Sequence, residues 1–282
     1  VRPVADWFEA AAARTRLLLV EDSAFVLNRL KSYSYAQSAS YLLTVIPLFI
    51  LMGAFAHHAG VGRRLFDMAR KWVGHMPGGL AIASVLTCAG FAATSGSSVA
   101  TAATVGAVAI PEMKRAGYDP RLSAGAVAAG GVLGVLIPPS VLLIFYAALT
   151  EVSAGKMLVA GVLPGLLSTL VFVAGIWVVA ASGRVGAAPL PRHGWGERLA
   201  SLKDGWQVVM LFVIVLGGIY LGIVTATEAA AVGALAALIM LLCAAQARGS
   251  LRGKLYESFR NAITTTVMIL FTMLGAGIFS FF

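Results

Sequence analysis

Four hydroxyl side chains cluster around one glycine in the segment Thr94-Ser95-Gly96-Ser97-Ser98, and nonpolar residues flank this segment on both sides. Hydroxyl oxygens and the free carbonyl oxygens of an unwound turn are hard ligands, which suit a desolvated alkali cation. Such a neutral cage needs no carboxylate, whereas a proton relay would place Asp, Glu or His at its centre. We therefore predict a sodium site here, with Ser95, Ser98 and Thr101 as ligands.

A second interruption, Ile137-Pro138-Pro139-Ser140, breaks a later apolar run. A backbone that unwinds inside a bilayer loses hydrogen bonds that hydrocarbon cannot replace, so a polar partner has to be present. In transporters with paired broken helices, that partner is the substrate and its coupling ion. The half-helices that follow the two breaks would direct partial positive charge at a bound anion. The remaining predicted site residues are Gly96, Pro138 and Pro139 at the hairpin tip and helix break, Thr94, Ser97 and Ser140 at the substrate, and Gly134 and Ile137 at the sodium ion.

The composition predicts that these interruptions lie in a membrane protein. Hydrophobic residues make up 59% of the chain and charged residues 12%, and the mean hydropathy is +0.89, well above the range of soluble domains. The net charge of +9 does not indicate a nucleic-acid partner, because Lys and Arg lie between apolar runs and form no long basic stripe. Cys88 and Cys243 lie in separate apolar runs and predict neither a disulfide framework nor a metal site. The fold class is therefore an all-α polytopic membrane protein in the lipid bilayer.

Apolar runs separated by basic loops are the elements that position the two breaks. Tyr41 to Ala56 is a short first span, and residues 57–77 contain an amphipathic helix expected to lie on the membrane surface. Leu80 to Ala93 and Val99 to Ile110 are each shorter than the about 20 residues of a perpendicular span, which favours a re-entrant hairpin over two crossings. Charge places four loops on the cytoplasmic side, because they hold 15 Lys and Arg against one in the two opposite loops: residues 57–77, 112–121, 183–205 and 246–260.

Other interpretations compete with a transport site. Small residues such as Gly130, Gly131 and Gly134 also allow close helix packing. A membrane-embedded hydrolase with Ser97 or Ser98 as nucleophile would need a base within reach, but the four histidines fall in predicted surface loops. The same loop positions, without supporting Cys or carboxylate residues, argue against a metal site. Glu228 follows Thr225 and Thr227 and is typical of a capped helix start; contact with a partner is its alternative role.

Several motifs in a fixed order carry a family resemblance: IPLFILMGAFAHHAGVGRRLFD, MPGGLAIASVL, SGSSVATAATVGAVAIPEMKRAGYDP, LIPPS and GIYLGIVTATEAAAVG. Over about residues 40–282 the chain resembles the large membrane subunit of tripartite ATP-independent periplasmic (TRAP) transporters. The resemblance implies sodium-driven secondary uptake of an organic acid, such as a C4-dicarboxylate or sialic acid, and no enzymatic activity. It also implies a periplasmic substrate-binding protein and a small membrane subunit as partners, in the bacterial inner membrane. The alternative is an anion/sodium symporter or ion antiporter that works without a binding protein.

The resemblance further implies two inverted repeats, each with a re-entrant hairpin and a broken helix. A second hairpin and a second broken helix would follow Phe282, so this chain is expected to hold one sodium site and half of a substrate site. The predicted organisation is a surface segment at 1–40, a first repeat at 41–182 with its hairpin at about 78–113 and its broken helix at about 121–149, a cytoplasmic loop at 183–205, and the start of a second repeat at 206–282.

Overall fold

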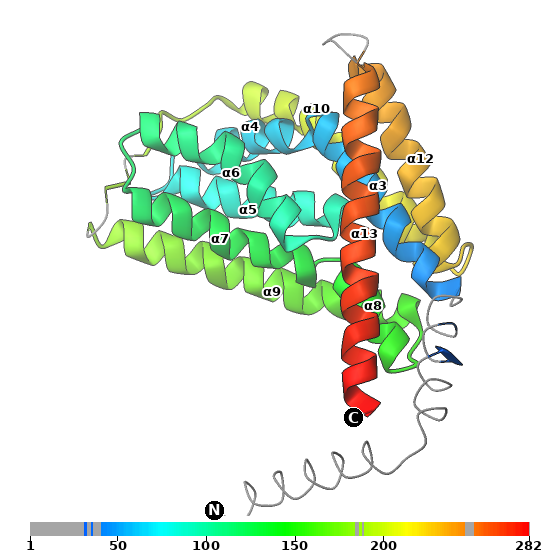
Figure 1. Cartoon of the computed structure of the whole chain (residues 1–282). Helices are drawn as coiled ribbons and strands as arrows, with labels where there is room; N and C mark the ends of the chain where they lie inside the picture. Colours follow the sequence, from blue (N-terminus) through cyan, green and yellow to red (C-terminus); the bar gives the residue numbers. More distant parts are fainter. Residues whose placement is uncertain are drawn as a thin grey trace, which may run out of the picture. The chain divides into compact units, whose positions relative to one another are not determined.

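The computed structural model describes residues 31–32, 35, 41–183, 186–187, 189–245 and 251–281. These residues contain helices and no strand, which confirms the predicted all-α class (Figure 1). They belong to two compact units, one formed by Thr44–Ile263 and the other by Val1–Leu43 with Thr264–Phe282. The predicted surface segment at 1–40 lies almost entirely outside the described residues.

The described residues contain both long apolar helices and helix pairs joined at a bend. Among these residues, four helices are long and apolar enough to cross a membrane, and the number rises to six if each of two bent pairs counts as one span. The chain is therefore a multi-pass membrane protein. In chain order the elements are η1 (Tyr41–Thr44), α3 (Val45–His58), α4 (Val61–Val73), α5 (Gly79–Ser95), α6 (Ser98–Arg115), α7 (Pro120–Leu136), α8 (Val141–Leu149), α9 (Ala154–Ala181), α10 (Trp195–Phe212), η2 (Val213–Gly217), α11 (Gly218–Tyr220), α12 (Ala226–Ala245) and α13 (Leu251–Phe281).

The first bent pair joins an apolar helix to an amphipathic one. α3 turns by 64° into α4 at Gly60, whose φ of 79° needs a residue without a side chain. The apolar residues of α4 recur at helical spacing, so that Leu65, Phe66 and Ala69 are buried while Arg63 is exposed. This is the amphipathic helix that the sequence predicts.

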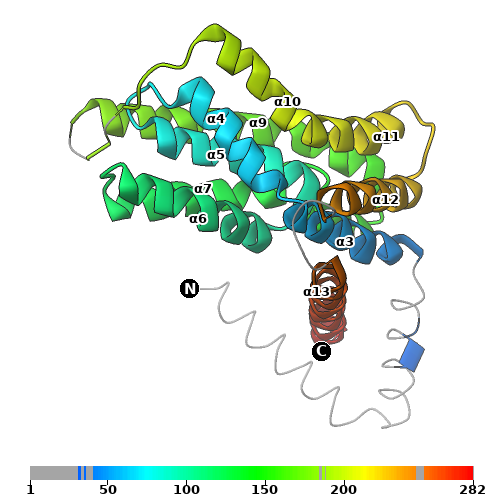
Figure 2. The same cartoon turned by 90° about the horizontal axis from the view of Figure 1, so that it is seen from above.

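A four-helix layer holds the two predicted breaks. α5 and α6 form a helical hairpin, α7 packs on both of its arms, and α9 packs on α5 and α7 (Figures 1 and 2). The arms contain 17 and 18 residues. At about 1.5 Å per residue, each arm is shorter than a bilayer core of about 30 Å. This length is compatible with a re-entrant hairpin, which stays a prediction.

Parts of three stretches predicted as loops are helical. α6 continues to Arg115, into the predicted loop at 112–121. α13 begins at Leu251, inside the predicted loop at 246–260. α10 begins at Trp195, so the predicted loop at 183–205 is helical over its second half. Gly194, Gly196 and the nearby prolines suggest a loop, but the strong helix formers Glu197 to Lys203 prevail over that signal.

The start of α12 is capped as predicted. The Glu228 carboxylate accepts hydrogen bonds from the Thr225 backbone N–H at 2.7 Å and from the Thr225 hydroxyl at 2.8 Å. In return, the Glu228 N–H donates to Thr225 Oγ1 at 3.3 Å. This reciprocal pair satisfies two helix-terminal groups, which confirms the structural role of Glu228.

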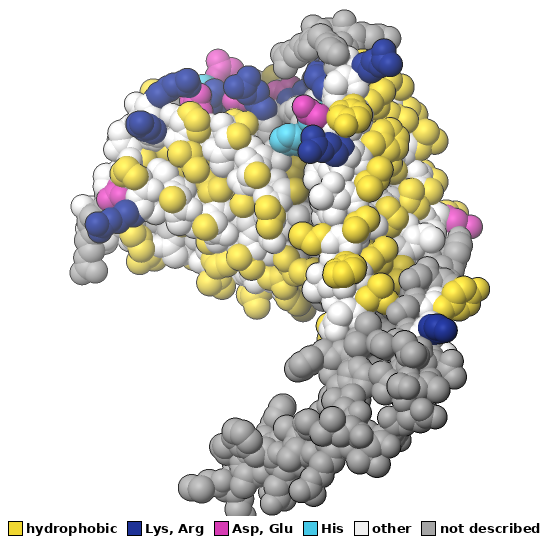
Figure 3. Space-filling view, in the orientation of Figure 1, with side chains coloured by type: hydrophobic (Ala, Val, Ile, Leu, Met, Phe, Trp, Pro, Cys, Tyr) yellow, Lys and Arg dark blue, Asp and Glu magenta, His cyan; other side chains and the backbone are white. Residues whose placement is uncertain are grey.

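Charge and apolar surface are separated on the outside of the molecule. On the face shown in Figure 3, Lys, Arg, Asp and Glu gather mainly along the upper edge, and apolar side chains cover a broad area below it. α9 contributes large exposed apolar residues, among them Leu163, Leu167 and Leu170. An apolar surface with charge gathered at its edge is what a lipid bilayer favours.

Candidate functional site

The hairpin tip is a glycine turn between two helices. α5 ends at Ser95 and is followed by Gly96, whose φ of 59° lies in the left-handed region and whose N–H donates to Ala92 O at 3.1 Å. Ser97 is extended and caps α6, because its Oγ accepts a hydrogen bond from Ala100 N at 3.3 Å. The SGSS sequence thus supplies both a helix stop and a helix start within two residues.

The second break also ends at a serine that caps the following helix. α7 ends at Leu136, and the chain bends by 43° before α8 begins at Val141. Pro138 and Pro139 lack the N–H groups that would continue the helix. Ser140 then caps α8, accepting from Leu143 N at 3.4 Å. Ser97 and Ser140 are therefore equivalent: each is the N-cap of the half-helix that follows a break.

The two breaks contact each other. Val141 N donates a hydrogen bond to Gly96 O at 3.3 Å, which joins the hairpin tip directly to the start of α8. A methyl group placed on Gly96 would lie 2.7 Å from Pro139 O, a distance that non-bonded atoms do not tolerate. Gly96 is therefore required by its backbone conformation and by the approach of a second backbone. All four residues from Ile137 to Ser140 are buried.

Two of the predicted sodium ligands form a buried oxygen pair. Ser95 Oγ and Thr101 Oγ1 lie 2.7 Å apart, and the two residues are 3% and 0% exposed. Gly134 of α7 lies beside them: a methyl group there would be 2.6 Å from Ser97 O and 2.9 Å from Thr101 Oγ1. The structure thus brings together two hydroxyl oxygens, one carbonyl oxygen and a glycine that makes room for them.

The other predicted site residues lie around this pair with different partners. The Thr94 hydroxyl donates to Phe91 O at 2.8 Å, within its own helix. Ser98 is half-buried, and its carbonyl oxygen would be 3.3 Å from a methyl group at Gly131. Ile137 packs on α9, where a methyl group at Gly165 would be 2.7 Å from Ile137 Cγ1. Ile137 and Thr94 therefore frame the breaks, while Ser95, Ser97, Thr101 and Gly134 meet at one point.

α3 contributes contacts to the hairpin that the sequence does not predict. Gly53 packs so closely on the tip that a methyl group there would be 2.6 Å from Ser95 Cα. One turn further along α3, His57 Nδ1 lies 2.7 Å from Thr104 Oγ1 of α6. The sequence places His57 in a surface loop, but it is in the last turn of α3. In the sequence, these contacts are indicated only by the spacing of Gly53 and His57, which lie four residues apart at the end of an apolar run.

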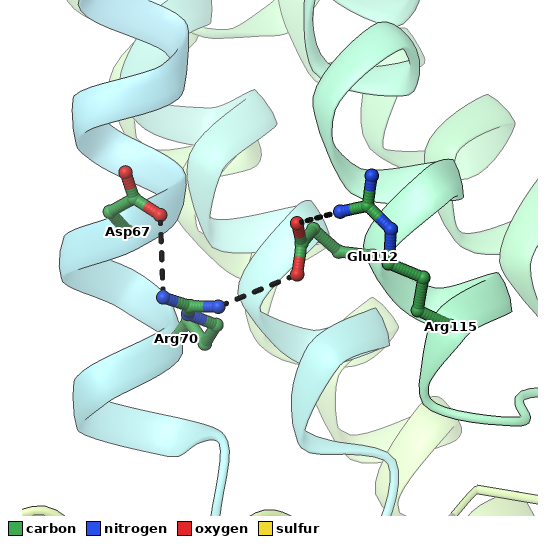
Figure 4. A network of polar contacts seen from close by, with 4 residues as sticks. All are labelled: Asp67, Arg70, Glu112 and Arg115. Atoms are coloured by element: carbon green, nitrogen blue, oxygen red, sulfur yellow. Dashed lines mark hydrogen bonds and ion pairs between the residues drawn. The ribbon is translucent and has the colours of Figure 1, made fainter.

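A charged network joins the amphipathic helix to the hairpin (Figure 4). Arg70 of α4 lies 3.5 Å from one carboxylate oxygen of Glu112 in α6, and Arg115 lies 2.7 Å from the other. Arg70 also lies 3.7 Å from Asp67 within α4. Glu112 is therefore the bridge between the two helices. Among the described residues, no group of three or more His, Cys, Asp or Glu could hold a metal ion.

Glu112→Gln is expected to lower the stability of the fold by a small amount. The change removes the charge that faces both arginines, but about a third of each side chain of the Arg70–Glu112 pair is exposed, so solvent screens it. We expect a loss of about 1 kcal/mol or less, measured as a lower melting temperature of the purified protein in detergent. Asp67→Asn is the control, because it leaves the bridge between helices intact. An equal effect of both changes would contradict the bridging role.

Comparison with known proteins assigns the chain to a family. The profile of the family described as "Tripartite ATP-independent periplasmic transporter, DctM component" matches residues 2–282. The chain belongs to the DctM family of TRAP transporter permeases. Its place in this family and its apolar helices make it a multi-pass protein of the bacterial inner membrane. The family is one of transporter permeases and not of enzymes.

Individual TRAP permeases align over most of this chain. The C4-dicarboxylate TRAP transporter large permease protein DctM of Pseudomonas aeruginosa is 44% identical over 96% of this chain and 62% of its own length. The isethionate TRAP transporter permease protein DctMQ of Oleidesulfovibrio alaskensis is 36% identical over 98% of this chain and 43% of its own length. The sialic acid TRAP transporter large permease protein SiaM of Vibrio cholerae is 31% identical over 85% and 55%. The chain therefore spans about half the length of these relatives.

Proposed function

We propose that this chain forms one sodium site and half of the substrate site of a TRAP transporter that takes up an organic acid. In this proposal the transporter is a sodium symporter, and a periplasmic substrate-binding protein delivers the substrate. A small membrane subunit completes the complex. The observation that carries the proposal is the contact between the hairpin tip and the helix break, where Ser95, Thr101 and Ser97 O lie together beside Gly134.

The chemistry of this cluster favours an alkali cation. Its oxygens are neutral hydroxyl and carbonyl groups, the ligand type that hard cations prefer. No Asp, Glu or His belongs to it, so a proton would have no ordinary acceptor there. Because Ser95 and Thr101 are buried, their oxygens are shielded from water, and a bound cation would offset the loss of hydration. Ser98 follows Ser97 in the chain and Ile137 lies three residues after Gly134, and both stay candidate ligands.

The proposed anion site lies at the amino ends of α6 and α8, which follow the two breaks. α6 and α8 each begin at a break with a serine cap, and the amino ends of helices attract negative charge. Ser97 and Ser140, together with Thr94, are the residues of this chain proposed to contact a carboxylate. The relatives' names include C4-dicarboxylate, sialic acid and isethionate. All three are organic acids; the first two are carboxylates, and isethionate is a sulfonate. We assign a carboxylate as the substrate class because two of the three names, including that of the 44% identical relative, are carboxylates.

The proposal is tested by a flux assay with the complete transporter in proteoliposomes. A sodium gradient and the soluble binding protein are supplied separately and together, with a C4-dicarboxylate as the probe. We expect uptake only when both are present. Uptake without the binding protein would favour the alternative of an independent anion/sodium symporter or antiporter. Equal uptake with a potassium gradient in place of sodium would contradict the cation assignment.

A further inference from the structure

α10 carries a continuous stripe of exposed apolar side chains. The intervals between its members alternate between four and three residues, which keeps them on one face of the helix. Trp195, the first member, is 71% exposed. The members of this α10 stripe are Trp195, Leu199, Leu202, Trp206 and Val209.

The first turns of α10 belong at the level of lipid headgroups. The span Trp195–Tyr220 has 26 residues, which at about 1.5 Å per residue exceeds the about 30 Å of a hydrocarbon core. The charged residues of the span are all in its first ten positions. At about 100° per residue, Arg198 and Lys203 flank the α10 stripe, whereas Glu197 and Asp204 lie on the opposite face. Within α10, both charges that border the stripe are thus positive.

Basic residues gather where the start of α10 meets the turn between α4 and α5. Arg198 Nη2 donates to His75 Nδ1 at 3.3 Å, and its guanidinium group lies 5.5 Å from the centre of the Trp195 ring. His75 lies between α4 and α5. Burial lowers the pKa of His75, and the charges of Arg198 and then Arg192 lower it further. Arg198 contacts His75 directly, and Arg192 follows two residues after Leu190, whose backbone N–H bonds to Gly74 O beside His75.

This basic cluster of His75, Arg192 and Arg198 has no acidic partner in the described part of the chain. Neither arginine forms an ion pair with a carboxylate there, and the adjacent Glu197 pairs with His193 at 2.7 Å. Arg198 Nε is buried and has no hydrogen-bond acceptor among the described residues. A bound anion would supply the missing negative charge and an acceptor.

The backbone holds the cluster in place. Leu190 N donates to Gly74 O at 2.9 Å, which fixes the segment before α10 against the turn that carries His75. Gly205 of α10 packs on Met68 of α4, where a methyl group would be 2.6 Å from the Met68 sulfur. Packed elements therefore bring the basic groups together, so the binding of an anion would lose less free energy in ordering them.

We propose that the basic cluster binds the phosphate of an anionic phospholipid whose acyl chains lie along the α10 stripe. Arginine and phosphate form charge-assisted hydrogen bonds, and basic pockets beside membrane helices suit anionic headgroups. The apolar stripe starts at the cluster and continues into the span. A free phosphate ion would make no contact with this stripe, whereas the acyl chains of a lipid would cover it. This assignment does not depend on the proposed transport cycle.

Tryptophan quenching tests the assignment on the complete permease in nanodiscs. The probes are phosphatidylglycerol and phosphatidylcholine with brominated acyl chains, each at the same mole fraction in an unbrominated background. The contribution of Trp195 is the difference between the wild-type protein and Trp195→Phe. We expect brominated phosphatidylglycerol to quench this signal several-fold more than brominated phosphatidylcholine, and excess inorganic phosphate to leave the difference unchanged.

Paired variants show whether the basic cluster causes the preference. Arg192→Ala with Arg198→Ala is expected to abolish it. Lys114→Ala with Arg121→Ala removes the same charge from exposed positions on α6 and α7 and is expected to preserve it. Arg192→Lys with Arg198→Lys keeps the charge and should retain part of the preference in a folded protein. Equal quenching by both lipids, loss of the preference in the Lys114 and Arg121 control, or displacement by inorganic phosphate would overturn the assignment.

Discussion

Gly134→Ala is expected to reduce sodium-driven uptake by about fivefold to a hundredfold, because the new methyl group would lie 2.6 Å from Ser97 O and 2.9 Å from Thr101 Oγ1. Ser97 O belongs to the backbone of the hairpin tip, so relief of the contact requires the tip and α7 to separate. Overpacking of this kind costs about 1–3 kcal/mol, and about 1.4 kcal/mol corresponds to a tenfold change. Uptake by proteoliposomes and the sodium concentration for half-maximal rate are the measurements.

Gly125→Ala is the matched control for this change. Gly125 lies in the same helix, and a methyl group there would meet no atom within 4 Å. Both substitutions raise helix propensity by the same amount, so a difference between them isolates the contact at the hairpin tip. We expect Gly125→Ala to transport normally. Equal uptake by the two variants, at equal amounts of protein in the membrane, would mean that Gly134 does not adjoin the functional site.

Thr101→Val is expected to raise the sodium concentration for half-maximal uptake about tenfold or to abolish sodium activation. Valine keeps the shape of threonine but removes Oγ1, which lies 2.7 Å from Ser95 Oγ. Loss of one buried polar partner costs about 1–3 kcal/mol. Ser95→Ala is expected to act in the same direction, whereas Thr101→Ser keeps the oxygen and should stay near wild type. Uptake at graded sodium concentrations and constant ionic strength measures these effects.

Thr87→Val controls for the removal of a buried hydroxyl from the hairpin. The Thr87 hydroxyl is also buried, but it donates to Ala83 O at 2.6 Å within α5. Its loss is therefore expected to leave sodium activation unchanged. A similar shift in Thr87→Val and Thr101→Val would attribute the effect to general weakening of the hairpin and not to ligand loss.

The sequence predicts the elements of this site because its signals are local. A glycine among serines marks the end of one helix and the start of another, and consecutive prolines interrupt the next. The amphipathic spacing of α4 is equally plain. Residues 195–205 show where such signals conflict: flanking glycines and prolines indicate a loop, but helix formers at an apolar spacing decide the structure.

The contacts between elements are not readable from the sequence. Gly125 and Gly134 are both glycines in one apolar helix, and only the packing of α7 on the hairpin places one in open space and the other against Ser97 O. The His57–Thr104 and Arg70–Glu112 pairs join residues separated by 47 and 42 positions. Such pairs depend on how whole helices cross, which a single sequence with a broad apolar pattern does not specify.

Direct sodium binding is the measurement that tests the central claim, that the paired breaks hold a cation. The complete permease in detergent, without substrate, is titrated with radioactive sodium in the wild-type, Thr101→Val and Thr87→Val forms. We predict saturable binding to the wild type and to Thr87→Val, and a loss of affinity of about tenfold or more in Thr101→Val. Sodium binding that is equal in all three proteins would contradict a site at Ser95 and Thr101.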